Sequence, residues 1–483
     1  MKPASFPHAL IILTVCVLLA GVLTYLLPAG HYARVADKVT GRETVVAGSY
    51  QRTEAHPVGF ASMMLDIPRG LVAAGEIIAS ILIFGGAFCT IDRTGAFRAG
   101  IGWLITRFSH APSVVLCLIG CAFAIGGALD NMSEEIIALI PVMVYTTSRL
   151  GYSRNCAVAI STGCAVIGAA FSPINPFQAG IAEKIGQVAL FSGSGFRIAF
   201  LVPAIGFWIF WVLRHSALTR ESGGSRDAQP EACATGAPGP ARKSNANAEG
   251  PADLVGRQAD SAERPAGDLL LMPYHRLILI LVALAFALMI YGILRLDWDF
   301  NEMSAEFFVL GLVCGFIGKL GANGTAGAFA EGVKEMALAA FIVGMARGVY
   351  LVLQDGGIID TIIYDLFTPL RYLPVFLSAL GMMIAHVFIH IPVSSTSGQA
   401  VLTIPLLSPL ADLTGMSRQV MILAYQYGAG LTEMFAPTNG ALMGVLLVAG
   451  ISYKDWWAFV WKPLLVLMGI GVLAIGAAIA VGL

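Results

Sequence analysis

The stretches "FSPINPFQAG" at Phe171 to Gly180 and "FAPTNGALMG" at Phe435 to Gly444 decide the fold of this chain. At an offset of 264 residues, the phenylalanine, first proline, asparagine and final glycine of the two stretches coincide. The same offset, kept without gaps, gives eleven identities over the 51 positions from Asp130 to Gly180. Chance agreement between two apolar stretches would not select proline, asparagine, glycine and arginine. The sequence therefore predicts an internal duplication, which is typical of secondary transporters.

The composition predicts a membrane protein. Of 483 residues, 57% are hydrophobic and 12% are charged, which leaves too few polar side chains to cover a soluble globule. A helix needs roughly 20 apolar residues to cross a bilayer. The stretches predicted to cross are His8 to Leu27, Leu71 to Ile91, Pro112 to Leu129, Arg154 to Phe171, Arg197 to Leu213, Arg276 to Ile293, Glu306 to Leu320, Glu335 to Leu353, Val375 to Ile391, Arg418 to Phe435 and Trp456 to Gly482. We expect a multi-pass protein of the cell inner membrane or plasma membrane, in contact with the lipid bilayer.

The charge and the motifs argue against two classes of function. A net charge of −1 gives no indication of a nucleic-acid partner. The chain has no GxxxxGKS or GxxxxGKT loop, so nothing suggests an ATP-driven pump.

A polar segment divides the chain. From Ser216 to Asp268 the composition changes to Ala, Gly, Pro, Ser, Asn, Glu and Arg, which cannot bury enough apolar area to offset the entropy of ordering. The predicted organisation is a first membrane repeat at 1–215, a disordered linker at 216–272 and a second membrane repeat at 273–483. The second repeat is expected to hold one extra transmembrane helix, Arg276 to Ile293, without a counterpart in the first. The segment from Asp92 to His110 is either a tilted crossing or, as its charged residues favour, a helix lying flat.

Each repeat contains a polar cluster before its broken helix. These clusters are "DNMSEE" at Asp130 to Glu135 and "SSTSGQ" at Ser394 to Gln399. The apolar arms that follow have about 16 residues and contain a proline, so they are too short for a comfortable full crossing. We interpret each cluster as the tip of a re-entrant hairpin, which is tolerated at membrane depth where it lines a water-filled cavity or is buried in protein.

The two Pro-x-Asn stretches are interpreted as helix breaks. A proline removes a backbone donor and frees carbonyls of the preceding turn, and Asn175, Thr438 and Asn439 supply side-chain oxygens and amides. The exposed N-terminal helix end favours a carboxylate, and the freed carbonyls favour a cation such as sodium. Alternatively, each proline is a simple kink. If the breaks form the site, Asn175→Ala and Asn439→Ala should abolish transport with little loss of folded protein.

Ionisable residues at membrane depth are costly and tend to be functional. Glu433 precedes the second break and is the preferred ligand for a cation, a substrate amine or a proton, with an interfacial glutamate as the alternative. Because neighbouring helical residues point apart, at most one of Glu134 and Glu135 should face the site. Arg347 would pair with a substrate carboxylate or, equally well, with a structural one. The predicted substrate-binding residues are Asn131, Ser133, Glu134, Glu135, Asn175, Arg347, Ser395, Thr396, Ser397, Glu433, Thr438 and Asn439, of which Ser133, Asn175, Ser397 and Asn439 are the predicted cation ligands.

Other polar residues receive weaker roles. Arg154 and Arg418 open matched helices and are interpreted as interfacial anchors. Glu76 and the pair His386 and His390, four residues apart, belong to a proton route or a pocket wall. An intramembrane enzyme would have to combine one of these histidines with a tip serine. We expect no catalytic residue, no cofactor and no metal other than sodium.

Several motifs together resemble the YfcC family of the C4-dicarboxylate anaerobic carrier group. They are "LLPAGHY", "NMSEEIIALIPVMV", "SPINPFQAGIAEKIG", "GMARGVYLVLQDGGIIDTII", "SSTSGQAVLTIPLLSPLADLTGMSRQVMILAYQYG" and "PTNGALMGVLLVAGISYKDW". The resemblance covers both halves but not the linker, and "NMSEE" departs from the family's usual Gly-Met-Ala-Glu-Glu. It implies the ion transporter superfamily, in which homodimers combine a scaffold with a transport domain that moves as an elevator. It also implies inverted repeats, which the residues alone leave undecided against parallel ones.

The predicted fold is thus an all-α polytopic membrane protein built from two inverted repeats with re-entrant hairpins and broken helices. The predicted function is a secondary active transporter or exchanger of a small carboxylate-bearing solute, coupled to sodium or protons. Glu433, Glu134 and Glu135 favour a substrate with an amino group, and the family includes basic amino acid carriers for arginine/ornithine exchange. A C4-dicarboxylate is the alternative substrate, and a channel or an intramembrane enzyme is a less favoured class.

Overall fold

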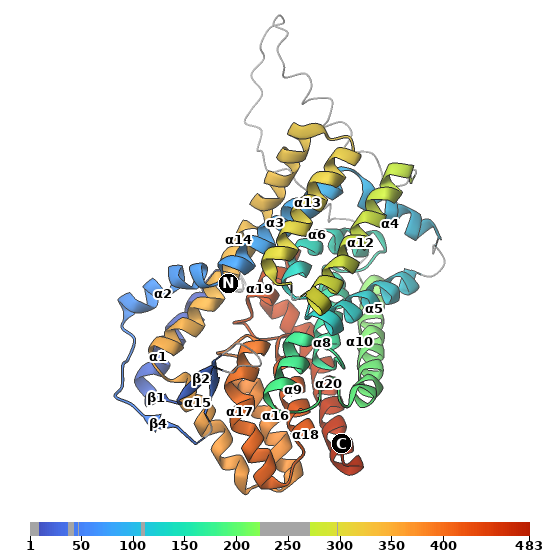
Figure 1. Ribbon diagram of the computed structural model, residues 1–483. Coiled ribbons are helices and arrows are strands. Elements are labelled where there is room, and N and C mark those ends of the chain that lie inside the picture. Colours follow the sequence, from blue (N-terminus) through green and yellow to red (C-terminus); the bar gives the residue numbers. More distant parts are fainter. Residues whose placement is uncertain (1–8, 37–42, 47, 108–111, 223–270, 297) are drawn as a thin grey trace, which may run out of the picture.

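The computed structural model describes residues 9–36, 43–46, 48–107, 112–222, 271–296 and 298–483 (Figure 1). The described chain is mostly helical, and seven of its helices are long and apolar enough to cross a membrane. Most of the predicted linker, residues 223–270, lies outside the described part. The preceding residues, Ser216 to Ser222, continue the last helix of the first half, so this part of the linker prediction was wrong.

The first half contains helices and four short strands. Its elements are α1 (Ala9–Leu26), β1 (Gly30–His31), β2 (Arg34–Ala36), β3 (Glu43–Val45), β4 (Gln51–Arg52), α2 (Phe60–Ala73), α3 (Gly75–Arg93), α4 (Ala96–Arg107), α5 (Pro112–Asp130), α6 (Glu134–Arg149), α7 (Arg154–Val158), the π-helix η1 (Ala159–Gly163), α8 (Cys164–Ala170), the π-helix η2 (Pro176–Gly180), α9 (Ile181–Ile185) and α10 (Ser194–Ser222). Strands β1 and β4 pair antiparallel, as do β2 and β3. The sequence analysis predicted neither pair.

The second half contains α12 (Pro273–Leu296), α13 (Phe300–Ile317), α14 (Gly321–Asp355), α15 (Ile359–Phe367), the 3-10 helix η3 (Thr368–Tyr372), α16 (Val375–His390), α17 (Thr396–Thr414), α18 (Arg418–Thr432), α19 (Gly440–Ala449) and α20 (Tyr453–Val481). Helix α12 takes the position in this order that α1 takes in the first half.

Several predicted boundaries shift for local reasons. The predicted span Leu71 to Ile91 is interrupted at Ala74, between α2 and α3. Helix α13 begins earlier than predicted because Asp299 caps it, with the Glu302 carboxylate accepting from the Asp299 amide at 3.0 Å. Helix α14 has 35 residues. It begins earlier than predicted because its first turns are helical although they lack the hydropathy of a membrane span. Helix α4 has 12 described residues, fewer than a membrane crossing needs.

Close packing of glycines fixes the hairpins against the broken helices. A Cβ atom on Gly127 of α5 would lie 2.0 Å from the carbonyl oxygen of Ala165, and one on Gly168 would lie 2.1 Å from that of Ala124. Helices α5 and α8 thus approach backbone to backbone. In the second half, Gly428 of α18 meets Met383 of α16 in the same way, with the Met383 carbonyl 2.4 Å from the added Cβ. Each hairpin arm is therefore seated on the broken helix of its own half.

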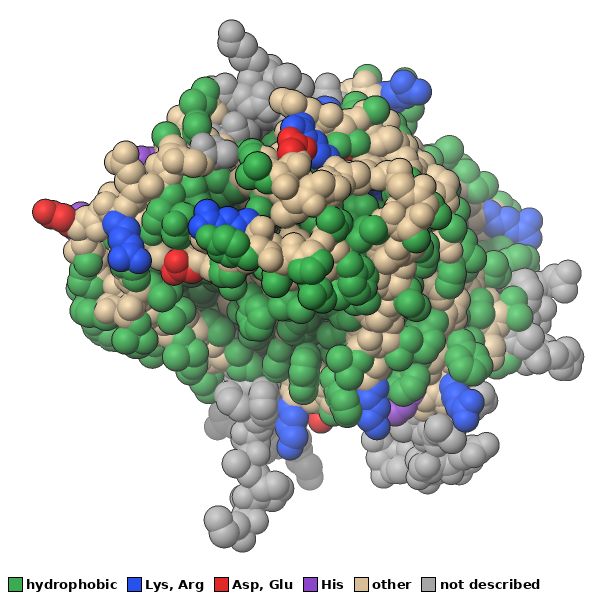
Figure 2. Space-filling view, turned by 90° about the horizontal axis from the view of Figure 1, so that it is seen from below, with side chains coloured by type: hydrophobic (Ala, Val, Ile, Leu, Met, Phe, Trp, Pro, Cys, Tyr) green, Lys and Arg blue, Asp and Glu red, His purple; other side chains and the backbone are tan. Residues whose placement is uncertain are grey.

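The outer surface suits a lipid environment. Large hydrophobic side chains are exposed along the helices, among them Val72 at 83% and Leu473 at 68%. Hydrophobic side chains cover much of the face in Figure 2, where charged side chains are few and scattered. Such a surface would be unfavourable in water, whereas a bilayer accepts it.

Candidate functional site

The predicted site residues come from distant parts of the chain and line one cavity of about 380 Å³, here called the inner cavity. Its wall is formed by both hairpin tips, the second helix break, α14 and the junction of α2 with α3. Ten of the twelve predicted substrate-binding residues line it: Asn131, Ser133, Glu134, Glu135, Arg347, Ser395, Thr396, Ser397, Glu433 and Asn439. Asn175 and Thr438 are not among the lining residues.

Three of the five carboxyl-bearing residues that line the inner cavity belong to the predicted site. Glu433 lies just after α18 and is 6% exposed. Glu134 and Glu135 are the first two residues of α6, and both line the cavity. Both residues lie in the first turn of α6, so the N-terminal end of this helix borders the cavity. The Oε2 atom of Glu135 is buried without a hydrogen-bond partner among the described residues.

Asn131 links the first hairpin tip to the second break. Its side chain hydrogen-bonds to the Glu433 carboxylate, and its backbone carbonyl accepts from the Ser133 hydroxyl at 3.0 Å. Its φ of +55° is in the left-handed region, which asparagine tolerates better than most residues. The tip is thus shaped to present amide and carboxyl groups together.

Arg347 of α14 supplies the positive charge of the inner cavity. Its guanidinium carbon lies 4.7 Å from the ring centroid of Tyr350, a cation–π arrangement in which the ring attracts the guanidinium. Within the described chain, no carboxylate lies within ion-pair distance of Arg347. The alternative, in which Arg347 pairs with a structural carboxylate, is therefore not observed. The guanidinium donors of Arg347 are available to a ligand.

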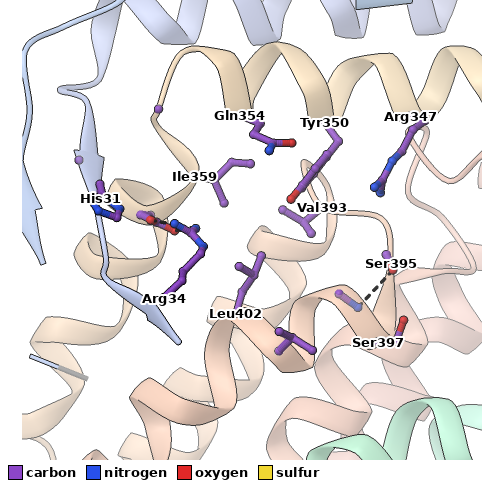
Figure 3. Close-up of a pocket in the computed structure, with 15 residues that line it drawn as sticks. His31, Arg34, Arg347, Tyr350, Gln354, Ile359, Val393, Ser395, Ser397 and Leu402 are labelled. Carbon is purple, nitrogen blue, oxygen red and sulfur yellow. Dashed lines mark hydrogen bonds and ion pairs between the residues drawn. The ribbon is translucent and has the colours of Figure 1, made fainter. Parts of the chain in front are cut away.

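A second cavity of about 660 Å³, the outer cavity, adjoins the first (Figure 3). Arg347, Tyr350 and Ser397 line both cavities, so the two share a wall. Strands β1 and β2 and their turn border it, where Arg34 forms an ion pair with the buried Asp360 at 2.9 Å. The outer cavity is therefore rich in cationic and hydroxyl groups, whereas the inner cavity holds the carboxyl cluster.

The second hairpin tip is held by hydrogen bonds to the second break. Ser395 caps α17 by accepting from the Gly398 amide at 3.2 Å. Ser394 donates to the Thr438 carbonyl at 2.9 Å, and the Thr438 hydroxyl donates to the carbonyl of Ile391. Thr438 thus joins hairpin to break. Ser395 and Ser397 both line the two cavities, and of the two only Ser395 caps α17.

The two asparagines of the Pro-x-Asn stretches, Asn175 and Asn439, have different hydrogen-bond partners. The Asn175 Oδ1 atom accepts from the amides of Phe177 and Gln178, both at 2.9 Å, and its Nδ2 group donates to the Gly127 carbonyl at 3.0 Å. Asn175 is fully buried. Asn439 caps α19 by accepting from the Leu442 amide at 3.0 Å and lines the inner cavity. Asn175 is therefore committed to the backbone, while Asn439 also borders the site.

The residues given weaker roles fall in three places. Glu76 lines the inner cavity near Asn301, whose amide lies 3.4 Å from its Oε1 atom. His386 and His390 are fully buried and both bind Gln399: His390 Nδ1 lies 2.9 Å from its Oε1, and His386 Nδ1 lies 3.0 Å from its Nε2. Neither histidine lines either cavity.

Arg418 is bound at the surface rather than in the site. It donates to both Asp412 oxygens, at 3.0 and 2.7 Å. The hydrogen bond from Arg418 lowers the pKa of Asp412. Arg154, its counterpart in the first half, lines neither cavity.

Sequence reasoning missed a buried polar network beside the first break. The Gln426 Nε2 group donates to the Ser172 carbonyl at 2.8 Å, and its Oε1 atom accepts from Arg197 at 3.2 Å. Arg197 also pairs with Glu183 at 2.6 Å, with both side chains fully buried. The available signal was a set of polar residues inside apolar stretches, such as the glutamine of "AYQYG". Tyr350, which follows Arg347 by one helical turn, was likewise missed.

Comparison with known proteins identifies the family. The profile of the DcuC family, C4-dicarboxylate anaerobic carrier, matches residues 6–216 and 258–480. The chain is 27% identical to an uncharacterized protein of Haemophilus influenzae, covering 97% of this chain and 96% of the relative. It is 29% identical to "Putative basic amino acid antiporter YfcC" of Escherichia coli, covering 94% and 92%.

Two solved transporters are also similar to this chain, at low sequence identity. The YdaH transporter of Alcanivorax borkumensis is 14% identical at a TM-score of 0.46, covering 99% of both chains. Neisseria gonorrhoeae MtrF, described among antimetabolite efflux pumps, is 15% identical at a TM-score of 0.41, covering 98% of this chain and 95% of that one. The family match spans both membrane halves, and its members reside in the membrane as multi-pass proteins. This chain belongs to the C4-dicarboxylate anaerobic carrier (DcuC) family of membrane transporters.

Proposed function

We propose that this protein is a secondary exchanger of small amino acids with a cationic side chain, such as arginine and ornithine. The observation that carries the proposal is the inner cavity, which is lined by five carboxyl-bearing residues (Glu76, Glu134, Glu135, Asp299 and Glu433) and by one guanidinium, that of Arg347, which has no ion-pair partner in the described chain. A ligand with a carboxylate and separate cationic groups complements both signs. The name of the Escherichia coli relative supports the same substrate class.

The chemistry gives each group a role. The planar guanidinium of Arg347 presents donors that match a carboxylate in a bidentate manner. Glu433 and Glu134 lie close enough for their charges to interact, and like charges in a water-poor cavity are costly unless a cation offsets them. A substrate ammonium or guanidinium in the inner cavity would offset that repulsion. Exchange of one cationic amino acid for another keeps the cluster neutralised throughout the cycle.

A C4-dicarboxylate is the second candidate. The family description favours it, as do Arg347 and Arg34 in the outer cavity. However, the Arg34 guanidinium is already paired with Asp360, and a second substrate carboxylate in the inner cavity would meet Glu433 and the two hairpin glutamates. The charge of the inner cavity therefore favours the amino acid.

The transport movement is proposed to be of the elevator type. Both halves follow the same order of elements, from α1 and α12 to α10 and α20, each with a hairpin tip and a helix break. This order supports two repeats, and the facing of hairpin one with break two supports an inverted relation between them. A scaffold that dimerises with a second copy and a mobile transport domain would then carry the cavity across the bilayer.

Counterflow in proteoliposomes tests the proposal. Vesicles loaded with unlabelled arginine should accumulate external labelled arginine or ornithine, while succinate-loaded vesicles should not. Agmatine, which lacks the carboxylate, should compete poorly. Accumulation driven by succinate but not by arginine would instead establish the dicarboxylate function. Protein-free vesicles are the control for leakage.

A further inference from the structure

The helix breaks expose backbone carbonyls, and protein side chains already occupy several of them. At the first break, Gln426 Nε2 donates to the carbonyls of Ser172 at 2.8 Å and Ala169 at 3.4 Å. The facing carbonyls of the first hairpin are bound as well: Asn175 Nδ2 donates to Gly127 at 3.0 Å, and the Ser172 hydroxyl donates to Ala128 at 2.6 Å. A sodium ion at this break would have to compete with these donors.

The second break is filled in a similar way from other elements. Trp456 Nε1 donates to the Met434 carbonyl at 2.8 Å, and the Tyr453 hydroxyl donates to the Phe435 carbonyl at 2.5 Å. The Thr438 carbonyl accepts from the hairpin serine, Ser394, as described above. Aromatic donors on α20 thus take positions where an ion would need free oxygen atoms.

The first break also borders a buried ion pair, that of Arg197 with Glu183. Arg197 is fully buried, binds Gln426 Oε1 at 3.2 Å, and is held by Glu183. The Glu183 carboxylate in turn accepts from the Phe191 amide at 2.7 Å. Gln426 is therefore fixed with its Nε2 group toward the carbonyls of the break, since Arg197 binds its oxygen. A carbonyl buried without a hydrogen-bond donor would be unfavourable. Because Gln426 supplies that donor, the carbonyls of the break are satisfied without a bound ion.

We propose that these side-chain donors take the place of a coupling sodium ion, with Gln426 as the positioning residue of the first break, so that transport runs without sodium. The substrate's own cationic group then offsets the negative charge of the carboxyl cluster, and this part of the inference rests on the proposed function. The sodium expected from the sequence would have used the freed carbonyls together with Ser133, Asn175, Ser397 and Asn439. Asn175 Oδ1 and Asn439 Oδ1 instead accept backbone amides.

Thermal unfolding of the purified, detergent-solubilised full chain tests this without any substrate. The apparent Tm should be the same in sodium chloride and in choline chloride of equal concentration. A rise specific to sodium would overturn the inference, whatever solute the protein carries. Failure of arginine counterflow, in contrast, would overturn the proposed function and leave this result intact.

Variants of Gln426 provide a second test of this inference. Gln426→Ala leaves the Ser172 carbonyl without its donor and opens space beside it, so this variant should gain a sodium-specific rise in Tm and lose exchange rate. Gln419→Ala is the matched control, because Gln419 lies on the same helix but donates to the Ser192 carbonyl and not to a carbonyl of the break; it should gain no sodium response. Gln426→Ser is the alternative if the alanine variant does not fold. Absence of any sodium response in a folded Gln426 variant would contradict the role assigned to this residue.

Discussion

The guanidinium of Arg347 stacks on the ring of Tyr350, with 4.7 Å between guanidinium carbon and ring centroid, and no carboxylate of the described chain neutralises it. The pair lies on one face of α14, at the wall shared by the inner and outer cavities. An unpaired arginine at membrane depth is costly. Its retention is explained if a substrate carboxylate completes its environment during transport.

Replacement of Arg347 should weaken binding of carboxylate-bearing substrates. Hydrogen bonds to charged groups contribute about 1.5 to 3 kcal/mol, so Arg347→Met should raise the KM for arginine roughly 10- to 150-fold. Competition by agmatine should change little, because agmatine has no carboxylate. Arg371→Met is the matched control, since Arg371 stacks on Tyr372 at 4.6 Å but lines neither cavity. An equal loss for arginine and agmatine would argue against the assigned contact.

Replacement of Glu433 should reduce discrimination between charged and neutral side chains. Glu433→Gln keeps the shape and the hydrogen bond from Asn131 but removes a negative charge, so the preference for arginine over its neutral isostere citrulline should fall about tenfold. Initial rates of counterflow with both solutes measure this ratio. Glu331→Gln, which removes an exposed carboxylate paired with Arg93, should leave the ratio unchanged. A preference for arginine that survives in Glu433→Gln would place the cation elsewhere.

The two asparagines of the breaks should differ in their effect on stability. Asn175→Ala leaves the amides of Phe177 and Gln178 without the side-chain acceptor that they bind, and each such loss costs about 1 to 3 kcal/mol. Asn439→Ala removes one helix cap, which costs about 1 kcal/mol. Asn175→Ala should therefore show the lower apparent Tm and yield of folded protein, while Asn439→Ala remains folded and loses transport. Equal Tm values for the two variants would contradict the structural assignment of Asn175.

The backbone contact between α5 and α8 should tolerate no side chain. Gly127→Ala places a Cβ atom 2.0 Å from the Ala165 carbonyl oxygen, and overpacking of this kind costs about 1 to 3 kcal/mol. Gly206→Ala meets no atom within 4 Å and should be neutral or slightly stabilising, since alanine favours a helix. Thermal unfolding in detergent compares the two. A Gly127 variant as stable as Gly206→Ala would mean that the hairpin and the broken helix are not packed as described.

Much of the architecture could be predicted because it depends on local sequence. Proline lacks a backbone donor, and its combination with asparagine and glycine in the two matched stretches predicts a helix break, so the breaks near Asn175 and Asn439 and the polar tips before them could be predicted from the sequence. Ten of the predicted site residues line one cavity because the duplicated motifs have the same position in each half. The membrane spans followed from hydropathy alone.

The remaining features depend on contacts between distant residues. Whether Arg347 meets a carboxylate depends on which helices face α14, and hydropathy does not contain that information. The commitment of Asn175 to Gly127 depends on the approach of α5 to α8. Likewise, Gln426 acquires its partners only when α18 packs beside the first break. Such polar residues inside apolar stretches indicate a buried network but do not identify its members.

The most direct test of the account is counterflow of labelled arginine into proteoliposomes loaded with unlabelled arginine, with sodium replaced by choline on both sides. The account predicts rapid transient accumulation that succinate inside the vesicles does not support and that Glu433→Gln diminishes. Accumulation in vesicles loaded with succinate but not in vesicles loaded with arginine would contradict the account. A lack of accumulation when sodium is absent would also contradict it.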